Sequence, residues 1–178
     1  MYDALRDPQL LILLALLLPA AFLDMRYHRI PNYLTYTAMI AGLTLGLVSA
    51  GTYGFGVHLL GLLAGGLPLY LMFLGGSLGG GDVKLMAAVG AIIGFPAALN
   101  ALIASILVGG LCAALILIWQ GRLLGMAHYS WRMLWHRVGV ASEAPAPLPA
   151  RRDAFPFGVA IALGTLSMAL PASAAGAG

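Results

Sequence analysis

The chain has 178 residues, of which 61% are hydrophobic and 8% charged, and its mean hydropathy is +0.95. A soluble domain typically carries about 25% charged residues, so this composition excludes a water-soluble globule of this size and indicates an integral membrane protein. The formal net charge of +3 does not indicate a nucleic-acid partner, because no basic face interleaved with aromatic residues stands clear of the apolar segments.

Long apolar segments follow one another along the chain. A transmembrane helix needs about 20 mostly apolar residues, and continuous apolar runs are typical of helices rather than of alternating barrel strands. We therefore predict an all-α, polytopic membrane protein with six transmembrane helices, forming a single membrane-embedded domain over residues 1–178. The predicted spans are 8–24, 32–50, 55–75, 82–95, 97–119 and 156–175.

The segment 120–155, between the last two spans, has a different composition. Residues 121–138 mix aromatic and aliphatic side chains with arginines and histidines, which is typical of an amphipathic helix in the membrane interface. Residues 141–150 contain three prolines and are expected to form a stiff linker. We predict one cytoplasmic amphipathic helix here, which either anchors the chain to membrane lipid or helps to dock a substrate.

The basic residues predict the orientation of the spans. With the N-terminus outside, eight of the nine Lys and Arg residues fall on the cytoplasmic side, and only Arg6 lies outside. The eight inner residues are Arg26, Arg29, Lys84, Arg122, Arg132, Arg137, Arg151 and Arg152.

Asp24 and Asp82 are carboxylates at the ends of apolar spans, where acidic side chains are rare and usually functional. The predicted orientation places both at the cytoplasmic side, Asp24 leaving the first span and Asp82 entering the fourth. The fourth span covers only about 21 Å against a hydrocarbon core of about 30 Å. We therefore expect Asp82 to lie below the headgroups, in a hydrated cavity enclosed by protein.

Each acid also has a purely structural explanation. Asp82 could be the N-cap of its helix, and Asp24 could pair with a nearby arginine or with Lys84 at the interface. Asn32 is expected to cap the second helix after the extended Pro31, and Lys84 is expected to point away from the acids, toward lipid headgroups.

Three ordered segments carry a resemblance to a known family. The run Gly79-Gly80-Gly81-Asp82 fits the GxGD signature of intramembrane aspartyl proteases. Its extension through Lys84 and Leu85 resembles the type IV prepilin peptidases, as does the segment from Arg29 to Thr35. The run Pro156–Ala160 is similar to that family's Pro-Tyr-Gly-x-Ala element, with Phe157 in place of the tyrosine.

The resemblance implies an aspartic endopeptidase of the bacterial inner membrane, multi-pass, with its active site facing the cytoplasm. It implies Asp24 and Asp82 as the catalytic pair, no metal or other cofactor, and the leader peptide of a type IV prepilin as substrate. The residues implied to support the pair are Gly79, Gly81, Lys84, Arg29, Pro31, Asn32, Pro156 and Gly158.

The single cysteine, Cys112, excludes a tetracysteine zinc site within this sequence. Larger family members carry a cysteine-rich domain that N-methylates the new amino terminus, and there is no room for it here. The chain thus resembles the short, peptidase-only branch associated with Flp (tight-adherence) pili, and we expect leader removal without N-methylation.

In an aspartic mechanism one carboxyl group is protonated and the other activates water. The helix dipole at the start of the fourth span favours Asp82 as the base, although arginines near Asp24 could reverse these roles. The alternatives are a small proton-coupled transporter, in which the acids form a proton relay, and a membrane scaffold without catalysis.

Overall fold

The computed structural model describes residues 8–27, 29–76, 78–119 and 157–175, together with Gly125, Trp131, Arg132 and Trp135. Every element among these residues is an α-helix, which confirms the all-α prediction for this part of the chain. Contacts divide the chain into two units, residues 1–109 with 156–178, and residues 110–155. The first unit contains the candidate site and is described below; most of the predicted amphipathic helix lies outside the described residues.

Among the described residues, three helices are long and apolar enough to cross a membrane by length and composition. They lie within α1 (Pro8–Tyr27), α2 (Asn32–Leu74) and α4 (Ala97–Trp119). Two shorter apolar helices are α3 (Gly80–Ile93) and α6 (Phe157–Ala175). The predicted span 97–119 coincides with α4. The count of six spans and the single domain stay predictions.

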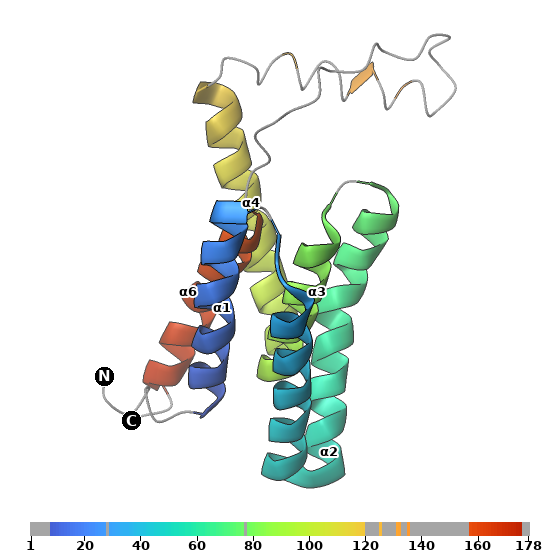
Figure 1. Ribbon diagram of the computed structural model, residues 1–178, viewed down its shortest axis with the longest axis vertical. Helices are drawn as coiled ribbons and strands as arrows, with labels where there is room; N and C mark the ends of the chain where they lie inside the picture. Colours follow the sequence, from blue (N-terminus) through green and yellow to red (C-terminus); the bar gives the residue numbers. More distant parts are fainter. Residues whose placement is uncertain are drawn as a thin grey trace. The chain divides into compact units, whose positions relative to one another are not determined.

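α2 is a helical hairpin (Figure 1). Its 43 residues include Ala50 (φ −143°, ψ 27°) and Gly51 (φ 59°, ψ −143°), whose dihedrals are not helical. The Gly51 conformation is essentially restricted to glycine, because a Cβ would clash with the backbone there. The break separates a first arm, residues 32–49, from a second arm, residues 52–74. It falls at the boundary predicted between the second and third spans.

α3 packs against both arms of α2 through glycines (Figure 1). A Cβ on Gly42 of the first arm would collide with the backbone of Ala91, and one on Gly61 of the second arm would collide with that of Gly90. Backbones approach this closely only where side chains are absent. These glycines therefore serve the packing of α2 against α3.

The C-terminal end of α3 is held by side chains from two other helices. Gln9 of α1 donates from Nε2 to the carbonyl of Ile92 at 2.7 Å, and Nδ1 of His58 lies 2.8 Å from the carbonyl oxygen of Ala91. These carbonyls belong to the last turn of the helix and have no intrahelical partner. His58 thus links the second arm of α2 to the end of α3.

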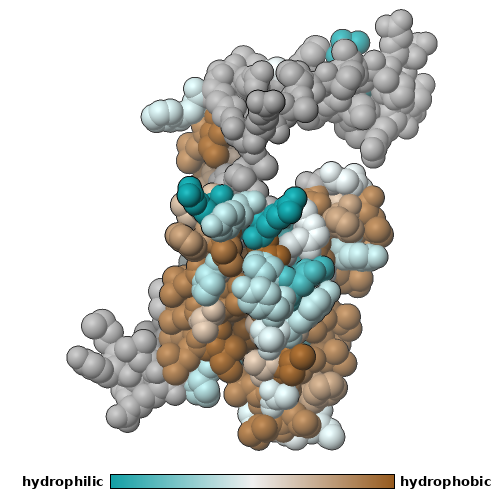
Figure 2. Space-filling model, viewed as in Figure 1, coloured by the Kyte–Doolittle hydropathy of each residue, from teal (hydrophilic) through white to brown (hydrophobic). Residues whose placement is uncertain are grey.

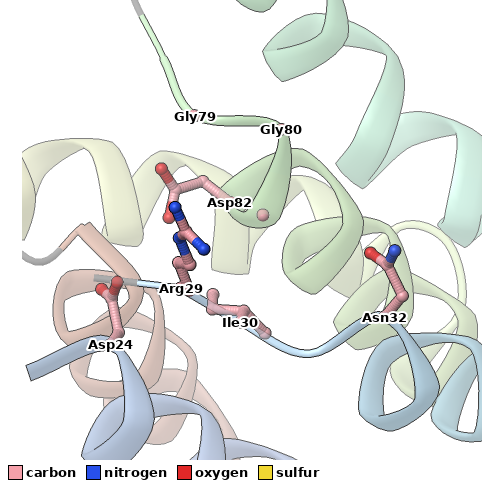
Figure 3. Close-up of a pocket in the computed structure, with 8 residues that line it drawn as sticks. Asp24, Arg29, Ile30, Asn32, Gly79, Gly80 and Asp82 are labelled. Atoms are coloured by element: carbon pink, nitrogen blue, oxygen red, sulfur yellow. The ribbon is translucent and has the colours of Figure 1, made fainter. Parts of the chain in front are cut away.

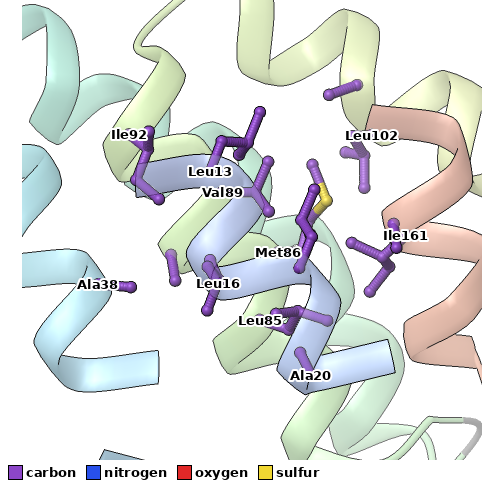
Figure 4. Close-up of a cluster of buried hydrophobic side chains, with 14 of the residues drawn as sticks. Leu13, Leu16, Ala20, Ala38, Leu85, Met86, Val89, Ile92, Leu102 and Ile161 are labelled. Atoms are coloured by element: carbon purple, nitrogen blue, oxygen red, sulfur yellow. The ribbon is translucent and has the colours of Figure 1, made fainter. Parts of the chain in front are cut away.

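The core of the first unit lies where α1, α3, α6 and the first turns of α4 meet (Figure 4). Side chains with almost no exposed surface include Leu16 of α1, Met86 and Val89 of α3, and Ile161 of α6. Large apolar side chains also cover the outer surface, as in Leu18 and Val48, which are 63% and 85% exposed. Figure 2 shows this mainly hydrophobic face, with hydrophilic residues gathered near the connection between α1 and α2. Such a surface is suited to lipid contact.

Candidate active site

A cavity of about 290 Å³ lies where the connection between α1 and α2 meets the start of α3 (Figure 3). It brings together the two acids that the sequence places in separate helices. The cavity is lined by Asp24, Arg29, Ile30, Asn32, Gly79, Gly80, Gly81 and Asp82.

Asp24 lies near the C-terminal end of α1 and is only 7% exposed. It occupies the buried face of the helix, four residues after Ala20, which is fully buried. Its Oδ2 accepts a hydrogen bond of 2.7 Å from the backbone N–H of Gly158, in the first turn of α6. The buried carboxylate is thus compensated by a main-chain donor, as burial of a polar group requires.

Asp82 is half-buried in the first turn of α3. The prediction that a helix begins at Asp82 is wrong by two residues, because Gly80 and Gly81 are already helical and Gly79 is the N-cap. Asp82 is therefore not the N-cap, and its own N–H donates to the carbonyl of Gly79 at 3.2 Å. The side chain of Asp82 folds back beside Gly79, whose Cβ, if present, would lie 3.3 Å from Oδ2.

The connection between α1 and α2 forms the second wall of the cavity. Pro31, with φ −64° and ψ 136°, is the N-cap of α2, and Asn32 is its first helical residue. The expectation that Asn32 caps the helix is wrong, because no side-chain cap hydrogen bond forms there. Instead its Oδ1 accepts a hydrogen bond of 2.9 Å from Nζ of Lys84.

Lys84 thereby connects the start of α3 to the start of α2. Its ammonium also lies 5.5 Å from the ring centroid of Tyr36, within the range of a cation–π contact. The expectation that Lys84 extends toward lipid headgroups is corrected by these two contacts, which both lie within the protein. A hydrogen bond across two helix starts has no periodic signature in the sequence, and so it was missed.

The remaining predicted residues fall into two groups. Gly79, Gly81 and Arg29 line the cavity directly, whereas Gly158 reaches Asp24 from outside its lining. Pro156 lies outside the described residues. Sequence reasoning missed Ile30, which supplies an apolar part of the wall between Arg29 and Asn32. The one signal for Ile30 in the sequence is its position within the segment from Arg29 to Thr35, which resembles the family.

The arrangement suits acid–base chemistry between two carboxyl groups. Two neighbouring carboxylates do not both ionise easily, so such a pair titrates as a unit. The carboxyl groups of both acids lie near the N-terminal end of a helix. Asp24 belongs to α1 but contacts the first turn of α6, and Asp82 is in the first turn of α3. The helix dipoles therefore do not decide which of the two acids is the base. Among the described residues, no three His, Cys, Asp or Glu side chains cluster as metal ligands would.

Comparison with known proteins finds two curated relatives of similar sequence. A prepilin leader peptidase/N-methyltransferase of Myxococcus xanthus (strain DK1622) is 32% identical over 119 residues, which cover 63% of this chain and 35% of that protein. A protein of the same description from Pectobacterium carotovorum subsp. carotovorum is 34% identical over 119 residues, which cover 62% of this chain and 41% of the relative. The match thus spans well under half the length of these curated relatives.

No solved structure matches the chain significantly. The sequence model of the type IV leader peptidase family matches residues 11–114, which is more than half of the chain and includes both acids and the glycine run. The chain belongs to the type IV leader peptidase family.

Proposed function

We propose that this chain is an aspartic endopeptidase that removes the leader peptide of type IV prepilins. The observation that carries the proposal is the shared cavity of Asp24 and Asp82, which come from different helices and lie beside the glycine run. Membership of the leader peptidase family and the similarity to prepilin leader peptidases support the substrate class. The catalytic roles of the two acids are part of the proposal.

The proposed reaction is hydrolysis of one peptide bond. The ionised carboxylate takes a proton from water as the water oxygen attacks the scissile carbonyl carbon. The protonated carboxyl group donates its proton toward the carbonyl oxygen and stabilises the tetrahedral intermediate. Collapse of the intermediate breaks the C–N bond, and the leaving amine takes the proton that the first carboxylate had removed from water. The products are a leader with a new carboxylate and a mature protein with a new amino terminus.

We further propose that the cavity faces the cytoplasm at the membrane boundary, in a multi-pass protein of the bacterial inner membrane. The excess of Lys and Arg on one side of the predicted spans supports this orientation. The gathering of hydrophilic residues near the α1–α2 connection fits a site at a membrane surface rather than at the midplane (Figure 2).

The substrate is proposed to be a Flp-type prepilin, processed without N-methylation. Incubation with a methyl-labelled S-adenosylmethionine tests the absence of N-methylation. A labelled amino terminus on the mature product would reject this part and leave the peptidase proposal intact.

The decisive experiment is cleavage by the purified chain in detergent or liposomes. Incubation with a Flp-type prepilin should give one product, whose new N-terminus is located by mass spectrometry at the leader junction. Asp24→Asn should abolish the product, whereas Asp7→Asn, which removes a carboxylate from the N-terminal segment, should leave it unchanged. Full processing by Asp24→Asn would exclude the two-carboxylate mechanism.

A further inference from the structure

The N-terminus of α6 meets the side chain of Asp24, although the two are 134 positions apart in the sequence. The backbone N–H of Gly158 donates to Oδ2 of Asp24 at 2.7 Å, and this contact is buried. N–H groups in the first turn of a helix have no intrahelical partner, so this donor is available without breaking the helix. It also adds the favourable interaction of a helix N-terminus with a carboxylate.

Residue 158 has no room for a side chain. A Cβ built there would lie 2.7 Å from Oδ2, 3.1 Å from Cγ and 3.2 Å from Cβ of Asp24. The backbone at Gly158 is helical, and its φ does not lie in the left-handed region that favours glycine. Space for the carboxylate, and not backbone conformation, therefore explains a glycine at this position.

A second glycine of α6 shows that this relation is specific. A Cβ on Gly164 would collide with the backbone of Ser105 in α4, so this glycine serves only the packing of two helices. Both glycines are buried in the same helix. The absence of a side chain at Gly158 makes room for the carboxyl group of Asp24. At Gly164 it makes room for the backbone of α4.

We propose that Gly158 is a positioning residue for Asp24. Its main-chain N–H fixes the rotation of the carboxylate so that Asp24 faces the cavity it shares with Asp82, and its lack of a side chain allows that contact. This inference rests on the proposed peptidase function for its kinetic consequence. The contact itself can be tested without activity.

The kinetic test compares two glycine-to-alanine exchanges in α6. Gly158→Ala should lower kcat for prepilin cleavage by about 100-fold, because a small displacement of a reacting group has an effect of this size. KM should stay within about threefold, since substrate contacts are unchanged. Gly164→Ala should lower the thermal stability but leave kcat of the folded enzyme within about threefold. Normal kcat for Gly158→Ala would overturn the proposal.

The second test measures thermal unfolding in a double-mutant cycle. Gly158→Ala should lower Tm by at least about 4 °C in the wild type, because the new Cβ presses on the carboxylate. In an Asp24→Ala background the carboxylate is gone, and less than half of that decrease should remain. Gly164→Ala should give the same decrease in both backgrounds. Equal effects of Gly158→Ala in both backgrounds would overturn the proposed contact.

Poor folding of the single variant does not remove the test. Recovery of the folded Asp24→Ala, Gly158→Ala double variant where Gly158→Ala alone is not recovered supports the proposal, and failure of both overturns it. If the wild-type chain does not cleave prepilin, the proposed function fails, whereas the stability cycle still decides whether Gly158 and Asp24 are coupled.

Discussion

The two ends of α3 are built in opposite ways. At the C-terminal end, the residues from Leu85 to Ile92 are all buried, side chains from α1 and α2 satisfy the last carbonyls, and glycines bring three backbones together. At the N-terminal end, the helix starts with two glycines beside a cavity, and the half-buried Asp82, a proposed catalytic residue, lines that cavity. One helix thus combines a closely packed end with an open one.

The difference shows how a short helix can present a functional group with little packing around it. Local stability follows the density of buried contacts, so the C-terminal end supplies the positional stability that the N-terminal end lacks. The glycines at the open end line the cavity that the two acids share. We therefore expect substitutions at the open end to affect activity and those at the packed end to affect stability.

The largest expected effect is that of Asp82→Asn at the open end. It removes a carboxyl group needed for proton transfer, and we expect prepilin cleavage to fall by at least about 1,000-fold. Thermal unfolding should change little, because the side chain is half-buried and contributes little packing. Cleavage rates and Tm measured on the same preparation check both parts. A large loss of Tm would mean that the open end also stabilises the fold.

The next effect is on the packed end, where Gly90→Ala forces a methyl group against the backbone of Gly61. Overpacking of this kind should lower the free energy of unfolding by about 2–3 kcal/mol. Gly80→Ala is the matched control at the open end, since its Cβ would lie 3.5 Å from the ring of Phe73, an ordinary contact distance. Unfolding by denaturant in detergent measures both. Equal losses of stability for the two variants would contradict the contrast between the ends.

A smaller effect is expected from His58→Leu. The substitution leaves the carbonyl of Ala91 without its side-chain partner, and removal of one such hydrogen bond lowers the free energy of unfolding by about 1–2 kcal/mol. Cleavage by the folded fraction should remain normal, because His58 does not line the cavity. Unchanged stability would show that the packed end does not depend on this carbonyl being satisfied.

The smallest effect is expected from Lys84→Met, which removes the hydrogen bond to Asn32 near the open end. This bond is exposed, and exposed polar contacts contribute about 0.5 kcal/mol or less. The methionine retains the length of the side chain and keeps contact with Tyr36. Denaturant unfolding should therefore give values within error of the wild type. A loss above about 1 kcal/mol would place a stabilising contact at the open end.

The sequence predicted the helices and the two acids well, for identifiable reasons. Continuous apolar runs define long helices, and the Ala50–Gly51 break appears as a small-residue gap between two such runs. The acids stand out because carboxylates are rare in apolar membrane-spanning segments. Their placement at one end followed from counting spans and basic residues.

Contacts through space were not predictable in the same way. The bonds from Lys84 to Asn32 and from Gly158 to Asp24 join residues 52 and 134 positions apart. No local periodicity encodes such pairs, and the motif match marked these residues without giving their roles. The predicted start of α3 is also wrong. Glycine has low helix propensity, and Gly80 and Gly81 therefore resemble part of the preceding loop in the sequence. Packing against neighbouring helices overrides that propensity.

The hairpin in α2 determines at which end of the bundle α3 begins. Because the chain reverses at Ala50–Gly51, Asn32 at the beginning of α2 and Phe73 near its end both lie beside the first turns of α3. Two antiparallel arms separate α1 from α3, so α3 begins at the same end of the bundle at which α1 ends. Deleting or adding one arm would carry Asp82 to the opposite end of the bundle, and no local repair of the GxGD run could bring the two carboxyl groups back into one cavity.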